Sequence, residues 1–288
     1  MKKFVETLHN GFQATYAIEE ILFHNKTEHQ ELIIFKNSIY GRMMALDGIV
    51  QTTEKDEFIY HEMFAHMPIL RHVNPKKVLI VGGGDGGLLR EVCKHQQIES
   101  ITMVEIDAAV VELSKKYLPN HSQGAFADPR LKLVISDGLD FIKNNKEQFD
   151  IILSDSTDPI GPGAALFAEQ FYQGCHSSLS DNGILVTQNG VSFLQTEELV
   201  ITKARMQPYF HKVGFYQADV PTYVAGNMNY AWAQKGEVLI RSAKEINDYL
   251  QDSSIITNYF TPELYLSAFN LPKYLLKSLL GDHEHARV

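Results

Sequence analysis

From residue 76 onward, short hydrophobic runs alternate with segments that are long enough to form helices. Four runs, at residues 78–81, 101–104, 131–135 and 151–154, consist largely of valine, isoleucine and leucine. Short runs that are apolar throughout are typical of parallel strands with both faces buried. The sequence therefore predicts an open α/β sheet whose strands are separated by helices. Helices are predicted near residues 87–95, 108–117, 167–179 and 195–210, and further strands near residues 184–187, 215–218 and 230–233.

The first part of the chain has a different character. Hydrophobic runs occur near residues 32–35 and 42–51, and Asp47-Gly48 interrupts the second of them. An Asp-Gly pair between apolar runs is typical of a β-hairpin, because both residues tolerate positive φ. We therefore expect a small antiparallel β domain over residues 1–55 and a larger α/β domain over residues 56–288.

A helix is predicted where the larger domain begins. Residues 53–56 resemble a capping box, hydrophobic residues recur at positions 59, 63 and 67, and Pro68 is expected to end the segment. The helix carries His61 and His66, which invites comparison with zinc sites of the H-E-x-x-H type. Those sites need histidines four residues apart, whereas these two are five apart and lie roughly 140° apart around the helix axis. No metal site is therefore predicted here.

A carboxylate follows each of the four hydrophobic runs. These residues are Asp85, Glu105, Asp137 and Asp155. Because ligands of open α/β sheets bind at the carboxyl ends of the strands, the four acids are expected to lie in one site. No Lys or Arg occurs between residues 78 and 89, so the cluster is expected to lack a neutralising base and to suit a cation or hydroxyl groups. The alternative to a ligand-binding role is that each acid only caps the N-terminus of the helix that follows its strand.

Composition and charge narrow the function classes. The chain has 288 residues, is 44% hydrophobic and carries a formal net charge of −9, which argues against a nucleic-acid partner. Cys93 and Cys175 have no C-x-x-C pattern and are expected to be reduced thiols. His283 and His285 are expected to belong to a frayed end rather than to a metal site. The sequence shows no apolar signal run at its N-terminus and no segment of membrane-spanning length, so a cytoplasmic protein is expected.

A glycine-rich turn follows the first of the four strands. Gly82, Gly84 and Gly87 match the dinucleotide pattern G-x-G-x-x-G, and Glu105 lies near the distance expected for a ribose carboxylate. On this motif alone, a nicotinamide oxidoreductase is a fair hypothesis. Asp85, however, would face the pyrophosphate, and each charge pair could cost several kcal/mol at an effective dielectric constant of about 20. The turn is better suited to an adenosine compound with a positively charged tail.

A sulfonium nucleoside meets this description. S-adenosylmethionine would bring its own carboxylate close to Asp85, which would repel it. The decarboxylated form carries a bare aminopropyl cation instead, so the sequence favours decarboxylated S-adenosylmethionine as the ligand.

Six stretches resemble the polyamine aminopropyltransferases, and specifically the bacterial spermidine synthases, along nearly the whole chain. They are residues 45–54, 58–63, 82–87, 104–107, 155–162 and 188–190. The resemblance implies a Rossmann-like sheet of the class I methyltransferase type, a small N-terminal β domain, and assembly into a homodimer or homotetramer. It also implies transfer of an aminopropyl group from decarboxylated S-adenosylmethionine to putrescine, which gives spermidine and methylthioadenosine. Because the donor carries its own leaving group, no metal or other cofactor is implied, nor is a nucleic acid or a membrane.

The resemblance also assigns roles to individual residues. The donor side comprises Gln30, Glu105, Asp137, Gly138 and Pro162. The polyamine side comprises His61, Asp85, Asp155, Ser156, Thr157 and Asp158, with Asp155 as the catalytic proton acceptor. Wall residues are Gln51, Tyr60 and Tyr223, and residues 159–163 form a lid or, alternatively, a static turn.

Two other functions remain open from the sequence. An S-adenosylmethionine-dependent methyltransferase would use the same sheet, although Asp85 disfavours it. A non-catalytic polyamine-binding protein would keep the acidic groove but would not need Glu105 and Asp137. The range of acceptor amines and the number of subunits are also open.

Overall fold

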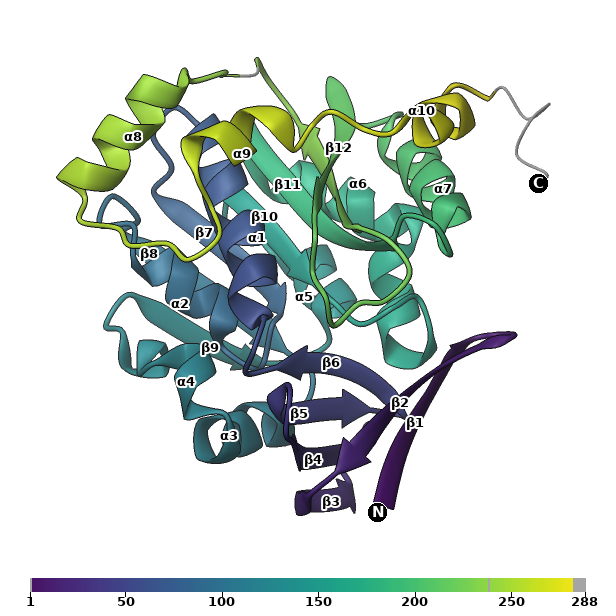
Figure 1. Cartoon of the computed structure of the whole chain (residues 1–288). Helices are drawn as coiled ribbons and strands as arrows, with labels where there is room; N and C mark the ends of the chain where they lie inside the picture. Colours follow the sequence, from purple (N-terminus) through teal and green to yellow (C-terminus); the bar gives the residue numbers. More distant parts are fainter. Residues whose placement is uncertain (1, 238, 282–288) are drawn as a thin grey trace.

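The computed structural model describes residues 2–237 and 239–281, and a seven-stranded sheet forms its centre (Figure 1). Along the sheet the strands follow the order β12-β13-β11-β10-β7-β8-β9, and β13 alone runs against the others. This arrangement confirms the predicted α/β sheet. The strands are β7 (Lys77–Gly82), β8 (Ser100–Glu105), β9 (Leu131–Ile135), β10 (Phe149–Asp155), β11 (Leu179–Val191), β12 (Lys212–Ala218) and β13 (Met228–Gln234).

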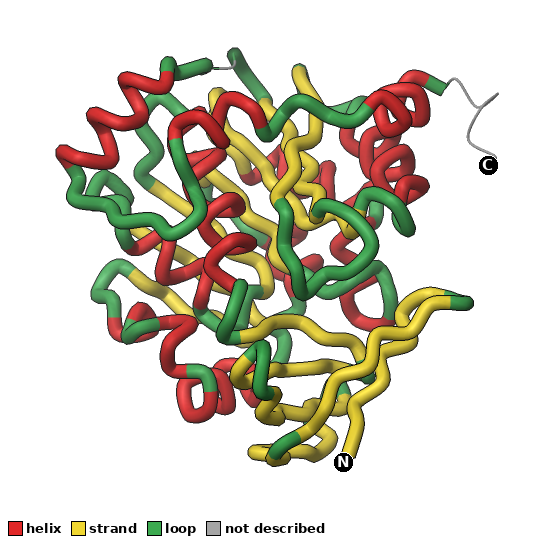
Figure 2. Tube along the Cα trace, in the orientation of Figure 1, coloured by secondary structure: helices red, strands yellow, loops and turns green. Residues whose placement is uncertain are grey.

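Helices cover both faces of this sheet, as Figure 2 shows in red against the yellow strands. One hydrophobic core joins the sheet to α1 (Glu57–Arg71), α2 (Gly87–Cys93), α8 (Ala243–Asp252) and α9 (Pro262–Ser267). A second core, on the other face, joins it to α5 (Gly138–Asn144), α6 (Glu169–Ser178), α7 (Thr196–Met206) and α10 (Lys273–Leu280). The remaining helical segments are α3 (Ala108–Tyr117), α4 (Pro119–Ser122) and the short 3₁₀ turns η1 (Ala125–Ala127) and η2 (Gly161–Phe167).

The N-terminal region forms two antiparallel β units beside the ends of the central strands (Figure 1). The hairpin predicted at Asp47-Gly48 is present, with φ angles of 47° and 81° at these two residues. Apolar side chains of this region pack against Val110 and Leu118, which fixes its position over α3. The strands are β1 (Lys2–His9), β2 (Phe12–Ile18), β3 (Glu20–Lys26), β4 (Glu31–Asn37), β5 (Gly41–Leu46) and β6 (Ile49–Thr53).

The boundaries of α1 differ from the sequence prediction. The helix begins at Glu57, and the Thr53 hydroxyl donates to the Asp56 carboxylate at 2.6 Å, so residues 53–56 are not a capping box. Pro68 lies inside the helix, which continues to Arg71. Proline removes one backbone hydrogen bond, but nearly the whole helix is buried in the core, and this packing outweighs the local cost.

Several other elements depart from the prediction. The helices α5, α8, α9 and α10 are absent from it, and β11 is much longer than residues 184–187. For α8 a signal was present, because Ser242 and Glu245 form a capping box at its start.

Cys93 and Cys175 are both unpaired, and His283 and His285 lie outside the described residues. Within the described part of the chain, no helix has the length and apolar character to cross a membrane.

Candidate active site

A deep cleft opens where the central strands end and the N-terminal β units approach them. Most of the residues singled out in the sequence line it. They are Gln30, Gln51, Tyr60, His61, Asp85, Glu105, Asp137, Gly138, Asp155, Ser156, Thr157, Asp158 and Tyr223. Pro162 lies in η2 between the lining residues Gly161 and Gly163, and its side chain is outside the described set.

The glycine turn after β7 places Asp85 beside Asp155. Gly82 has a φ of 83°, and a Cβ atom on it would overlap the backbone carbonyl of Asp155. The Gly83 amide donates to that same carbonyl at 3.1 Å. Asp85 is fixed within the turn, because its Oδ1 atom accepts from the Gly87 amide at 2.8 Å. The glycines thus permit a close approach of backbone to backbone that brings the two carboxylates into one cleft.

One end of the cleft is built on the strand end of β8. Glu105 is buried there, and its carboxylate accepts from the Asp107 amide at 2.9 Å. Burial is the main cause that raises the pKa of Glu105 to about 7. Gln30 reaches this end from the N-terminal region by donating to Asp107 at 3.1 Å. Asp107 therefore ties the two parts of the site together, a role that the sequence did not reveal.

The alternative role of a helix cap applies to one of the strand-end acids. Asp137 Oδ1 accepts from the Asp140 amide at 2.9 Å and so caps α5. The same residue lines the cleft with Gly138. A structural cap and a position in the site are thus compatible in a single carboxylate.

The opposite end of the cleft centres on Asp155. The Tyr60 hydroxyl donates to Asp155 Oδ1 at 2.7 Å. The pKa of Asp155 is raised to about 6, chiefly by burial, while the charge of His61 opposes this shift and that of Asp85 adds to it. A carboxylate whose pKa lies near the working pH can accept and release a proton readily.

Further polar contacts shape this end. Gln195 donates to Asp158 Oδ1 at 2.7 Å, and burial raises the pKa of Asp158. The Tyr223 hydroxyl donates to the Gln51 carbonyl at 2.6 Å, which joins the segment before β13 to β6. Asp158 therefore has a fixed carboxylate in the part of the cleft closest to α7.

His61 corrects the expectation that no base neutralises the acids. Its Nδ1 atom lies 2.6 Å from Glu57 Oε2, and its Nε2 atom lies 3.6 Å from Asp85 Oδ1. Burial lowers the pKa of His61, but Asp85 and Glu57 more than reverse this effect and raise it to about 9. His61 thus places a buried positive charge in the acidic cleft at neutral pH.

His66 lies apart from the cleft. Its Nδ1 atom is 2.8 Å from His95 Nε2, and its Nε2 atom is 3.0 Å from Glu91 Oε2. It takes part in a buried polar network and not in a site with His61, as the spacing on the helix predicted.

Some lining residues were missed in the sequence. Glu6 and His9 reach the cleft from β1, and the Glu6 carboxylate accepts from the Val50 amide at 2.7 Å. Nothing in the local sequence of β1 marks these residues, because their place depends on how the hairpin folds over the large sheet. Glu57, which contacts the lining residue His61, was also missed, although its position four residues before His61 was a readable signal.

Comparison with known proteins places the chain in a family. Residues 57–242 match the family model described as the spermine/spermidine synthase domain, and residues 4–54 match the spermidine synthase tetramerisation domain. The polyamine aminopropyltransferase of Pectobacterium atrosepticum is 53% identical over 275 residues, which is 95% of this chain and 96% of that protein. Polyamine aminopropyltransferase 1 of Pseudomonas aeruginosa is 54% identical over 280 residues, or 97% of this chain and 98% of that one.

Solved structures lead to the same family. A spermidine synthase in complex with the transition-state analogue AdoDATO has a TM-score of 0.90 and 37% identity, and the match covers 97% of this chain and 95% of that one. Spermidine synthase from Thermotoga maritima has a TM-score of 0.87 and 35% identity, with coverage of 97% and 94%. The fold is thus that of the methyltransferase-like α/β enzymes. Within this class, the chain belongs to the spermine/spermidine synthase family and is a polyamine aminopropyltransferase.

Proposed function

We propose that the protein is a spermidine synthase, which transfers the aminopropyl group of decarboxylated S-adenosylmethionine to putrescine. The observation that carries this proposal is the arrangement of four acids in one cleft. Asp85, Asp155 and Asp158 line one part of it, while Glu105 lies at the end of the neighbouring strand β8. The first group suits the amines of both substrates, and Glu105 suits the hydroxyl groups of a ribose.

The donor is proposed to lie across the glycine turn. Glu105 would accept hydrogen bonds from the ribose, Asp137 and Gly138 would contact the adenine, and Gln30 would contact the donor from the N-terminal side. Residues 159–163, including Pro162, would close over the nucleoside. Asp85 would bind the amine of the aminopropyl tail, because it lines the same cleft as Asp155.

The reaction is proposed to occur beside Asp155. The attacking amine is protonated at neutral pH, with a reference pKa near that of lysine, about 10, and only its neutral form carries a lone pair. The nitrogen forms a bond to the carbon of the aminopropyl group that is attached to sulfur, and the electron pair of the broken carbon–sulfur bond stays on sulfur. Asp155, hydrogen-bonded to Tyr60, takes the proton that the nitrogen loses. Holding nitrogen, carbon and sulfur in line supplies the rest of the rate enhancement.

The domain boundary and the assembly state are also proposals. We propose a β domain over residues 1–55, a catalytic domain over residues 56–288, and a cytoplasmic homodimer or homotetramer. The two family matches, over residues 4–54 and 57–242, support this division. The description of the first as a tetramerisation domain supports assembly through the N-terminal region.

A product assay tests the proposed function. The protein is incubated with decarboxylated S-adenosylmethionine and a panel of diamines, and the products are identified by mass spectrometry. We expect spermidine and methylthioadenosine from putrescine. Methyl transfer from S-adenosylmethionine would instead indicate a methyltransferase, and polyamine binding without turnover would indicate a binding protein.

Acceptor length gives a first prediction. One amine of the acceptor must be neutral to react while the other stays a cation held by acids of the cleft. Putrescine is therefore expected to have the highest kcat/KM, and longer diamines and spermidine lower values, because their second charge misses its position. A higher kcat/KM for spermidine than for putrescine would identify a spermine synthase instead.

Asp158 gives a second prediction. Its inferred role is to attract the acceptor cation, so Asp158→Asn is expected to raise the KM for putrescine with a smaller effect on kcat. The loss of a charge-assisted contact corresponds to about 1.5–3 kcal/mol. Asp252→Asn, at the exposed end of α8, removes the same charge far from the cleft and is the control. A change confined to kcat would assign Asp158 to the chemical step.

A further inference from the structure

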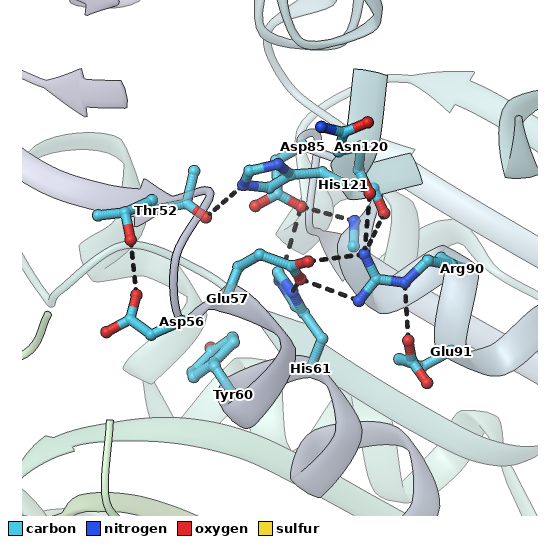
Figure 3. Close-up of polar contacts among 12 residues, drawn as sticks. Thr52, Asp56, Glu57, Tyr60, His61, Asp85, Arg90, Glu91, Asn120 and His121 are labelled. Carbon is cyan, nitrogen blue, oxygen red and sulfur yellow. Dashed lines mark hydrogen bonds and ion pairs between the residues drawn. The ribbon is translucent and has the colours of Figure 1, made fainter. Parts of the chain in front are cut away.

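A chain of charged side chains leads from the cleft into the protein between α1 and α2 (Figure 3). The His61 Nδ1–H group donates to Glu57 Oε2 at 2.6 Å. The two oxygens of Glu57 in turn accept from the Arg90 guanidinium at 2.7 and 2.9 Å. Glu57 and His61 lie four residues apart on one face of α1, whereas Arg90 comes from the helix that follows the glycine turn. A forked ion pair between Glu57 and Arg90 thus joins the two helices.

Arg90 is held firmly at the inner end of this chain. Its Nε atom donates to Glu91 Oε1 at 2.7 Å. One of its terminal nitrogens also donates to the carbonyls of Asn120 and His121, at 3.2 and 2.6 Å. Arg90 is only 7% exposed, so its charge is buried, and each of its three nitrogens donates to an acceptor. A guanidinium with this many fixed partners sets the orientation of the carboxylate with which it pairs.

The His61 ring is held on three sides. Glu57 binds its Nδ1 side, Asp85 faces its Nε2 side, and the ring packs on Gly87, where a Cβ atom would overlap it. A neutral imidazole has one N–H group and would present a lone pair to one of the two carboxylates. The geometry therefore favours a ring that is protonated on both nitrogens.

The groups around His61 decide whether its charge raises or lowers the pKa of Asp155. The titratable and charged groups that face it are Glu57 and Tyr60 of α1, Asp85 of the glycine turn, Arg90 of α2, His121 of α4 and Asp155 of β10. Burial lowers the pKa of His121, so this second ring does not supply a competing cation. The positive charge of His61 lowers the pKa of Asp155 and opposes the rise that burial causes.

We propose that Glu57 and Arg90 are positioning residues for aminopropyl transfer, because Arg90 fixes Glu57 and Glu57 holds the charged His61 ring toward Asp85 and Asp155. The kinetic part of this inference rests on the function proposed above. The ring keeps Asp155 ionised at neutral pH, where the reaction needs a proton acceptor. It also anchors the Oδ1 atom of Asp85, so that the other carboxylate oxygen can bind a ligand amine.

The test replaces Glu57 by glutamine, which keeps the shape but removes the charge. In the wild type we expect the His61 ring, observed by ¹⁵N NMR, to stay protonated up to a pH of about 9. In Glu57→Gln its midpoint is expected to fall by about one unit or more. The acid limb of kcat/KM for putrescine is expected to move to higher pH, because a His61 ring that Glu57 no longer holds does not keep its charge directed toward Asp155. A shift of one unit lowers kcat/KM about tenfold on that limb, and the difference from the wild type narrows as the pH rises.

Two further variants separate positioning from loss of structure. Glu62→Gln changes a buried carboxylate of the same helix that binds the backbone amides of residues 258–260, so it reports on structural damage alone. It is expected to lower Tm without moving the pH profile or the His61 titration. If Glu57→Gln does not fold, Glu57→Gln/Arg90→Gln removes both charges of the pair and leaves no buried charge unpaired between them. This double variant is expected to show the same shifts.

The outcomes distinguish this inference from the proposed function. A His61 titration and a pH profile that match the wild type in the Glu57 variant, or in the double variant, would overturn the positioning role. A change in Tm alone, as in Glu62→Gln, would also overturn it. If the wild type makes no spermidine, the proposed function fails, while the NMR titration of Glu57→Gln still shows whether Glu57 holds the His61 ring.

Discussion

Replacing Asp155 by asparagine is expected to lower kcat by roughly 10²–10⁴-fold with both substrates saturating, the usual range for losing an acid–base group. Asparagine is nearly isosteric, and its carbonyl oxygen can still accept from the Tyr60 hydroxyl, which lies 2.7 Å from Asp155 Oδ1. The fold and the affinity for the donor nucleoside should therefore be retained. Steady-state kinetics, thermal unfolding and donor binding on the same preparation check all three expectations.

The pH profile of Asp155→Asn supplies an independent readout of the same substitution. Because the pKa of Asp155 is raised to about 6, wild-type kcat/KM is expected to fall below that pH as the carboxylate becomes protonated. Above that pH, kcat/KM should increase further toward alkaline pH, because the amine loses its proton more easily. The variant should lack the acid limb. Asp252→Asn controls for the change in net charge, and a near-normal kcat in Asp155→Asn would assign the base to Tyr60 or to a bound water.

The sheet was predictable because its signal is local and repeated. The central strands β7 and β10 are buried on both faces, so they appear in the sequence as largely apolar runs. The Asp47-Gly48 turn was equally readable, since its positive φ angles demand particular residues. The place of Pro68 inside a helix and the presence of α10 were not predictable, because packing decides both. Pro68 continues α1 because that helix is buried, and α10 is anchored by Leu275 in the core.

The acidic half of the site was also predictable, for a topological reason. Parallel neighbouring strands end at one edge, so Glu105 and Asp155 had to approach the same cleft once the sheet was assigned. The positive charges that lie beside these acids were not predictable in this way. Arg90 stands just beyond the segment that lacks basic residues, and it pairs with Glu57, which in turn contacts His61. That connection exists only after α1 packs on α2, which no local pattern encodes.

Asp85→Asn is expected to weaken the preference for the decarboxylated donor. In the wild type, we expect Asp85 to attract the amine of the aminopropyl tail and to repel the carboxylate of S-adenosylmethionine. Loss of a charge-assisted contact should cost about 1.5–3 kcal/mol, which is roughly a 10- to 150-fold rise in Kd for the decarboxylated nucleoside. The affinity for S-adenosylmethionine should stay the same or increase, because the repulsion disappears. Isothermal titration calorimetry with both nucleosides measures the two changes.

The surroundings of Asp85 make this test specific. Both contacts recorded for Asp85 use Oδ1, which accepts from the Gly87 amide at 2.8 Å and faces His61 at 3.6 Å. An asparagine oxygen can keep the first contact, so the turn should hold its shape, while the His61 cation loses one of its two carboxylates. The His61 pKa should then fall, and Asp252→Asn should change neither this pKa nor either Kd. Equal affinity of the wild type for both nucleosides would refute the role of Asp85 in donor selection, because a carboxylate in that position cannot treat an added negative charge as neutral.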